Sequence, residues 1–159
     1  MKIEYINPFI DSVHKLFSAM LGSKVEQGQI GVAKDSSVPY ELTALIGLSG
    51  MARGTVAISF PAETAVAMVG KMLGIEVGEL NGSITDGVGE IVNIVAGSAK
   101  SKFTGDGSPI DLSLPNVIRG NNYTIEYPSQ AVWLEVPFES ELGPFNLRVT
   151  FELDKKGGR

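Results

Sequence analysis

Cysteine is absent from the 159-residue chain, and histidine occurs only once, at His14. Without cysteine the chain can form neither disulfide bonds nor thiolate sites. A single histidine inside a predicted helix cannot build a Ser-His-Asp triad or a histidine-rich metal site within one chain. The sequence also contains no nucleophile-elbow, S-x-x-K or P-loop motif, so covalent catalysis has no evident nucleophile.

Basic residues and long apolar runs are also scarce. The chain has 13 Lys and Arg against 18 Asp and Glu, and its formal net charge is −5. Its only basic cluster is the short tail with Lys155, Lys156 and Arg159. Because nucleic acids are bound through clustered positive charge, we expect no nucleic-acid partner. No apolar run approaches the roughly 18 residues of a membrane span, so we expect no membrane partner and a cytoplasmic location.

The apolar residues, 43% of the chain, are spaced as in a mixed α+β domain. We expect a single domain over residues 1–154, followed by a flexible tail at 155–159. It should contain a mostly antiparallel sheet with long helices packed on it, arranged as two related halves. A turn around Gly50 to Gly54 predicts a hairpin, and Ile110, Leu112 and Leu114 alternate as in a strand. The predicted helices span 8–21, 61–73 and 83–103. The predicted strands span about 41–48, 55–60, 117–127, 129–138 and 145–153, with a turn at Gly120-Asn121-Asn122 inside the segment 117–127.

The predicted helix from Ser83 to Phe103 has two unlike faces. One face is polar, because Asp86, Glu90 and Asn93 follow one another at helical spacing, and Gly97 continues their line. The other face is an apolar stripe typical of a core-facing helix, and consists of Ile84, Val88, Ile91, Val92, Val95, Ala99 and Phe103.

The polar row has a simple alternative explanation. Ser83 and Asp86 have the spacing of a capping box, and an acid in the first turn suits the helix dipole. Glu90 and Asn93 cap nothing and could belong to an ordinary solvated face. Glycines at positions 87, 89 and 97 each cost a helix about 1 kcal/mol relative to Ala, so the sequence predicts that something approaches this backbone closely.

The motif Asp86-x3-Glu90-x2-Asn93-x21-Pro115 resembles the signature of the CheC, CheX and FliY phosphatases of bacterial chemotaxis. The surrounding sequence agrees along nearly the whole chain. Because the motif occurs once, the chain is most similar to the CheX branch, since CheC members generally carry two copies. The resemblance implies an α+β domain, usually a homodimer, that removes phosphate from the aspartyl-phosphate of the response regulator CheY.

The resemblance also implies roles for the four residues. Asn93 would orient the attacking water, and Glu90 would form a salt bridge with the regulator's lysine. Asp86 would be an accessory residue, and Pro115 would shape the entry to a strand. The chain needs no cofactor of its own, because the Mg²⁺ belongs to the regulator's active site. Apart from the resemblance, the lack of a side chain at Gly89 and Gly97 predicts room for loops of the partner.

Three other functions must be compared with this one. Asp86 and Glu90 could be a glycosidase acid and base, but no apolar pocket is indicated that would raise one pKa. Together with Asn93 they could bind a hard cation, although three ligands on one helix are too few for a closed Ca²⁺ site. The serious alternative is a non-catalytic CheC-like or flagellar-switch-type binding module, which would have no need of the intact Glu90 and Asn93 pair.

The sequence also suggests how a homodimer could form. Trp133 would lie on the opposite face from the alternating apolar residues of the strand 129–138, so we expect this strand to be apolar on both sides. Such a strand at a sheet edge could pair with a second copy. Alternatively, Trp133 packs under a helix of its own chain. The alternating residues are Val132, Leu134, Val136 and Phe138.

Overall fold

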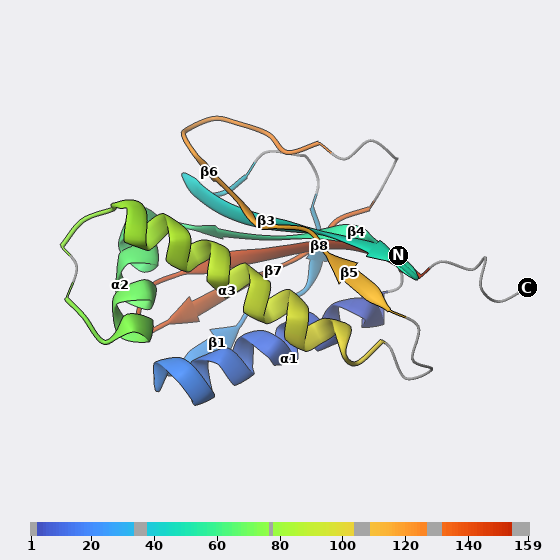
Figure 1. Cartoon of the computed structure of the whole chain (residues 1–159), viewed down its shortest axis with the longest axis horizontal. Coiled ribbons are helices and arrows are strands. Elements are labelled where there is room, and N and C mark those ends of the chain that lie inside the picture. The colour runs from blue at the N-terminus through green and yellow to red at the C-terminus, as the bar shows by residue number, and fades with distance from the viewer. Residues whose placement is uncertain (1–2, 34–37, 77, 104–108, 127–131, 154–159) are drawn as a thin grey trace, which may run out of the picture.

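The computed structural model describes residues 3–33, 38–76, 78–103, 109–126 and 132–153. In this part of the chain, three α-helices pack against an eight-stranded antiparallel sheet (Figure 1), which confirms the predicted α+β class. The predicted tail 155–159 lies outside the described residues. The helical segments are η1 (a 3-10 helix, Ile3–Ile6), α1 (Asn7–Leu16), η2 (a π-helix, Phe17–Leu21), α2 (Ala62–Leu73) and α3 (Gly82–Lys100). The strands are β1 (Val25–Gln27), β2 (Gly31–Val32), β3 (Leu42–Gly50), β4 (Ala52–Phe60), β5 (Ile110–Leu112), β6 (Asn116–Arg119), β7 (Leu134–Ser140) and β8 (Phe145–Leu153).

The sheet is built around two hairpins. Its strand order is β1-β7-β8-β4-β3-β5, and in addition β2 pairs with β7 and β6 pairs with β3. The predicted hairpin is formed by β3 and β4, with Leu48 opposite Gly54, and Gly50 at its tip has a φ of 94°. This hairpin joins the β7–β8 hairpin along β4 and β8. The two halves expected from the sequence therefore share one continuous sheet.

Two predicted strands end earlier than the sequence indicated. In the predicted segment 117–127 only β6, at its start, is a strand. The predicted turn at Gly120-Asn121-Asn122 follows it, and Asn122 has a φ of 58° in the left-handed region. The alternation through Leu114 is also misleading, because β5 ends at Leu112. Beyond β5, the Ser113 amide donates a hydrogen bond to the Gly47 carbonyl of β3, and the Ser113 hydroxyl oxygen accepts one from the Gly47 amide.

The predicted edge strand with two apolar sides is wrong. β7 buries Leu134, Val136 and Phe138 on one side, but Glu135, Pro137 and Glu139 on the other side are exposed or half-buried. The strand is not at the edge of the sheet either, because β1 and β2 both pair with its outer side. Dimerisation through a free β7 edge is therefore contradicted. Trp133 precedes β7 and is half-buried.

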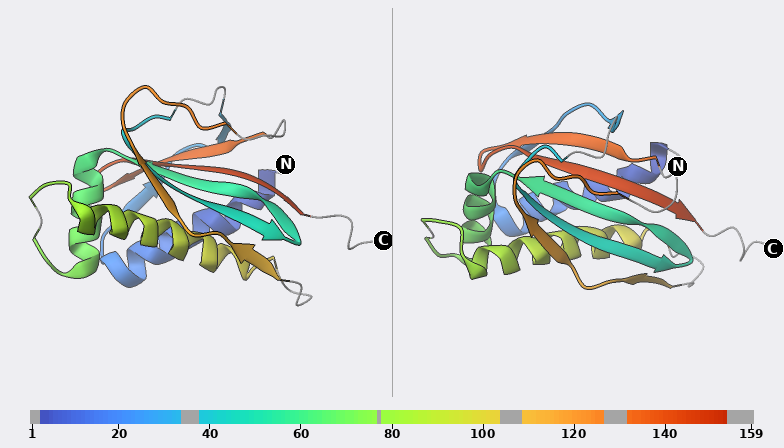
Figure 2. Two further views of the ribbon diagram at one scale, coloured as in Figure 1. Left: turned by 45° about the horizontal axis from the view of Figure 1, so that its top comes forward. Right: turned by 90° about the horizontal axis from the view of Figure 1, so that it is seen from above.

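One face of the sheet is covered by helices. α1 and α3 lie side by side beneath it, and α2 stands across its end (Figures 1 and 2). The core between the layers contains the inward-facing residues of β3, β4, β7 and β8 and the apolar stripes of the helices. The first helical stretch, formed by α1 and η2, ends as predicted at Gly22, and α2 ends as predicted at Gly74. The φ values of these two glycines, 57° and 71°, favour glycine. Within the described ranges, none of the helices has the length and apolar content required to span a bilayer.

Close packing between α2 and α3 depends on Gly87. A Cβ added at this position would collide with both γ-methyl groups of Val69 on α2, and the Cγ2 would be only 2.7 Å away. Val69 is fully buried and its branched side chain has little rotamer freedom. Gly82, at the start of the same helix, faces open space. The two glycines therefore have different structural roles.

We predict that Gly87→Ala lowers the free energy of unfolding by about 1–3 kcal/mol, because the two helices must move apart. Gly82→Ala is the matched control, and it should be neutral or stabilising by up to about 1 kcal/mol. Urea denaturation followed by circular dichroism measures both changes. Equal stability of the two variants would contradict the packing role of Gly87.

Candidate functional site: the outward face of α3

The motif helix begins one residue earlier than predicted. Asn81 is its N-cap, and the Asn81 side-chain oxygen accepts a hydrogen bond from the Ile84 amide at 3.2 Å. The predicted capping box of Ser83 and Asp86 is therefore wrong, because the cap lies upstream and Asp86 is beyond the first turn. The capping explanation of Asp86 no longer applies, and this carboxylate is exposed.

The predicted polar row lies on the outward side of α3. Glu90 is exposed and Asn93 is half-buried, while the stripe opposite them is buried against the sheet. Asp86, Glu90 and Asn93 make no side-chain hydrogen bond or ion pair with any residue that the structure describes. Residues three and four positions apart on a helix have Cβ atoms about 5–6 Å apart, so one bound group can contact two of them. The row can therefore offer two carboxylates and one amide to a partner.

Pro115 lies against this helix. A Cβ added at Gly89 would be 3.6 Å from Pro115 Cγ and 3.7 Å from Val117 Cγ2. The connection between β5 and β6 thus runs along α3, one turn before Asn93. The prediction that Gly89 makes room for a partner is wrong, because Gly89 is buried and its space is taken by the chain's own Pro115. Sequence spacing alone could not show which neighbour fills that space.

Asn93 lies between two glycines on the same face of α3. Gly89, Asn93 and Gly97 follow at i, i+4 and i+8, and a Cβ added at Gly97 would meet Leu112 of β5 at 3.9 Å. The turns before and after Asn93 therefore both face the β5–β6 segment. This arrangement explains why Asn93 is half-buried although Glu90 is exposed. Room for a partner beside Gly97 stays a prediction.

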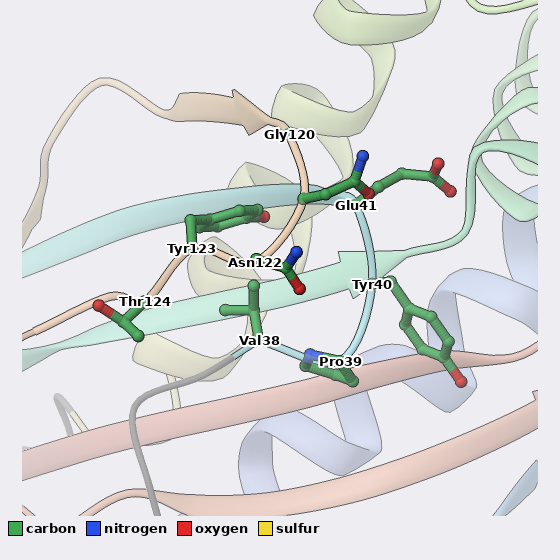
Figure 3. Close-up of a pocket in the computed structure, with 9 residues that line it drawn as sticks. Val38, Pro39, Tyr40, Glu41, Gly120, Asn122, Tyr123 and Thr124 are labelled. Atoms are coloured by element: carbon green, nitrogen blue, oxygen red, sulfur yellow. The ribbon is translucent and has the colours of Figure 1, made fainter.

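A hollow open to solvent lies between the segment that leads into β3 and the turn that follows β6 (Figure 3). It has a volume of about 470 Å³. The Tyr123 hydroxyl donates to Thr43 Oγ1 at 2.6 Å, and the Thr43 hydroxyl donates to Ser59 Oγ at 3.0 Å. Burial raises the pKa of Tyr123, and its hydrogen bond with Thr43 lowers it by less. The lining residues are Val38, Pro39, Tyr40, Glu41, Gly120, Asn121, Asn122, Tyr123 and Thr124.

This hollow was not found from the sequence, although the Gly120-Asn121-Asn122 turn was a usable signal. Its walls come from residues 38–41, which lead into β3, and from residues 120–124, which follow β6 and are distant in sequence. None of the motif residues lines it. Among the described residues, no group of three or more His, Asp or Glu could hold a metal ion. The α3 row is therefore the arrangement that brings motif residues together in this structure.

Comparisons with known proteins point to one family. Residues 42–139 match the family described as chemotaxis phosphatase CheX. The CheY-P phosphatase CheX of Thermotoga maritima is 29% identical over 138 residues, which are 86% of this chain and 88% of that protein.

Solved structures agree with this match. A CheC-like superfamily protein from Shewanella sp. PV-4 has a TM-score of 0.84 and 31% identity, and the alignment covers 96% of this chain and 99% of that one. In a CheX-CheY-BeF3-Mg²⁺ complex from Borrelia burgdorferi, the matched chain has a TM-score of 0.80, 23% identity and coverage of 95% and 99%. The latter likeness concerns the fold alone. Because the family match spans more than half of the sequence, the chain belongs to the CheX family of chemotaxis phosphatases.

Proposed function

We propose that this chain accelerates hydrolysis of the aspartyl-phosphate of a CheY-like response regulator. The observation that carries the proposal is the outward row of α3, where Glu90 and Asn93 have no partner among the described residues. A relative that is 29% identical over 86% of this chain supports the choice of substrate, since it is a CheY-P phosphatase. The motif spacing supports the choice of residues.

Asn93 has the side chain that the reaction requires. An acyl phosphate on a regulator already has Mg²⁺ and a lysine in the regulator's own pocket, so the phosphatase must mainly position a water molecule. The side-chain oxygen of Asn93 accepts a hydrogen bond from this water, and its N–H donates to a phosphoryl oxygen. A carboxylate at the same position would repel the phosphoryl group.

The reaction is a displacement at phosphorus. The oxygen of the oriented water attacks phosphorus in line with the bond to the aspartyl oxygen. That bond breaks, and the products are inorganic phosphate and the free aspartate of the regulator. The water protons pass to the phosphate product and to solvent. Asn93 remains unchanged, so the chain needs no covalent intermediate and no cofactor of its own.

Glu90 lies one turn before Asn93 and is exposed, so it can reach a cation on a docked partner. We assign it the salt bridge to the regulator's active-site lysine, which would fix α3 over the phosphoryl group. Asp86, a further turn back, is an accessory acid at the rim of the same contact. The cytoplasmic location predicted from the sequence belongs to this proposal, because the phosphorylated regulator would have to be reached there.

A non-catalytic binding module is the second candidate. The α3 row would then serve for contact alone, as in flagellar-switch-type proteins with a related fold. The unpartnered amide of Asn93 favours catalysis, because a contact surface has no requirement for an amide beside a carboxylate at this spacing. A turnover assay separates the two candidates.

We predict that Asn93→Ala lowers the phosphatase rate constant by about 10²- to 10³-fold, the usual effect of removing one positioned hydrogen-bonding group. Stability should change by less than about 0.5 kcal/mol, because the side chain makes no described hydrogen bond. The assay is the decay of a phosphorylated receiver domain, chosen from a panel. Asn121→Ala, in the lining of the hollow beside Tyr123, is the matched control and should retain full activity. Full activity of Asn93→Ala would refute the water-positioning role.

We predict that Glu90→Ala weakens binding of the regulator, and that this effect disappears when the regulator's active-site lysine is replaced by Ala. The coupling energy from the double-mutant cycle should be at least about 1 kcal/mol. Titration calorimetry with each pair of variants provides the four binding energies. Glu63→Ala on α2 removes an exposed carboxylate elsewhere and should show no coupling. Additive losses for Glu90 and the lysine would eliminate the proposed salt bridge.

A homodimer is also part of the proposal, although β7 does not provide its interface. The outermost strands of the described sheet are β1 and β2 on one side and β5 and β6 on the other, and all four are short. Dimerisation must leave both α3 rows free for one regulator per subunit. We predict a mass of twice 16.9 kDa by light scattering at micromolar concentration. A mass equal to that of one chain would exclude the dimer.

A further inference from the structure

Leu114 is unusually exposed for an apolar residue. Its exposed fraction is 86%, whereas the other exposed large hydrophobic residues of the described part of the chain lie between 46% and 60%. Isolated exposed leucines are common on proteins, so exposure alone shows no function. The surroundings of Leu114 add two further observations.

The backbone around Leu114 is fixed. The Ser113 amide donates to the Gly47 carbonyl at 2.9 Å, and the Gly47 amide donates to Ser113 Oγ at 2.8 Å. The Ser113 hydroxyl in turn donates to the Leu114 carbonyl at 2.9 Å. On the other side, the ring of Pro115 restricts Leu114 to extended backbone conformations. An apolar side chain on a backbone held in this way loses little conformational entropy when it is bound.

The same segment runs along the motif helix. Pro115 is packed beside Gly89, one turn before Asn93, and Lys100 near the end of α3 donates to the Ile110 carbonyl at 3.0 Å. The segment from Ile110 to Pro115 is thus attached to α3 at one end and packed against it at the other. A protein that presents a phosphoryl group to Asn93 must come close to this segment. No other exposed large hydrophobic residue of the described chain belongs to it.

We propose that Leu114 is a docking residue that inserts into an apolar site on the phosphorylated receiver domain, next to its phosphorylation pocket. This inference rests on the proposed function and adds to it a non-polar contact beside the polar row. Glu90 and Asn93 recognise charge and the phosphoryl group, while Leu114 contributes buried apolar area. Because the leucine side chain carries no group that can donate, accept or attack, Leu114 acts on binding of the receiver and does not take part in the chemical step.

The test uses the full chain and a purified receiver domain that the wild-type protein dephosphorylates. Leu114→Ala should raise KM about tenfold and leave kcat within twofold, which corresponds to about 1.4 kcal/mol of binding energy. The Kd for the same receiver loaded with beryllofluoride and Mg²⁺, measured by calorimetry, should rise equally. Val32→Ala is the matched control, because Val32 is a 56% exposed aliphatic residue at the opposite side of the sheet. Unfolding curves should show that both variants keep wild-type stability.

Each outcome separates the docking role from the proposed function. A selective rise in KM and Kd for Leu114→Ala supports the docking role. Unchanged KM and Kd, or equal changes in Val32→Ala, overturn it, even if Asn93→Ala is inactive as the proposed function requires. A fall in kcat without a change in Kd also overturns it, since Leu114 would then act in the chemical step. If the wild-type chain neither binds nor dephosphorylates any receiver in the panel, both proposals fail.

Discussion

Burial of the apolar stripe of α3 against the sheet is the constraint on which the site depends. Each fully buried Val or Ile contributes about 1.5–3 kcal/mol, and the stripe contains several that are at most 1% exposed. This gain exceeds the cost of about 1 kcal/mol for each helical glycine. Since one side of the helix is fixed in the core, the opposite side must face outward. Glu90 and Asn93 are oriented by the packing of residues that never touch a partner.

Two glycines of α3 lie in contact with the elements that border this outward face. Gly87 allows α2 to approach through Val69, whereas Gly89 lies beside Pro115 of the β5–β6 connection. Hydrogen bonds between Ser113 and Gly47 attach the same connection to the sheet. The motif proline and the motif helix are therefore joined by backbone packing. Asn93 lies at the border between the helix and this segment, an arrangement that suits the proposed water-positioning role.

The sequence predicted the parts that depend on long, regular periodicity. The two faces of α3 and the β3–β4 hairpin could be predicted because their patterns extend over many residues. The cap at Asn81 was missed because a plausible Ser83 capping box lay two residues further on. β1 and β2 are two or three residues long, too short for a clear alternating pattern. Their pairing with β7 makes β7 an internal strand. The exposure of Leu114 could not be predicted, because the neighbouring Ser113 is hydrogen-bonded to Gly47, which is distant in sequence.

The most direct test of the central claim is a structure of this chain bound to a receiver domain loaded with beryllofluoride and Mg²⁺. We expect the Asn93 amide within about 3 Å of a fluoride or of a water in line with the aspartyl–beryllium bond. The Glu90 carboxylate should lie within about 4 Å of the receiver's lysine ammonium. A complex in which the receiver contacts another face of the chain, with Glu90 and Asn93 still in solvent, would contradict the claim.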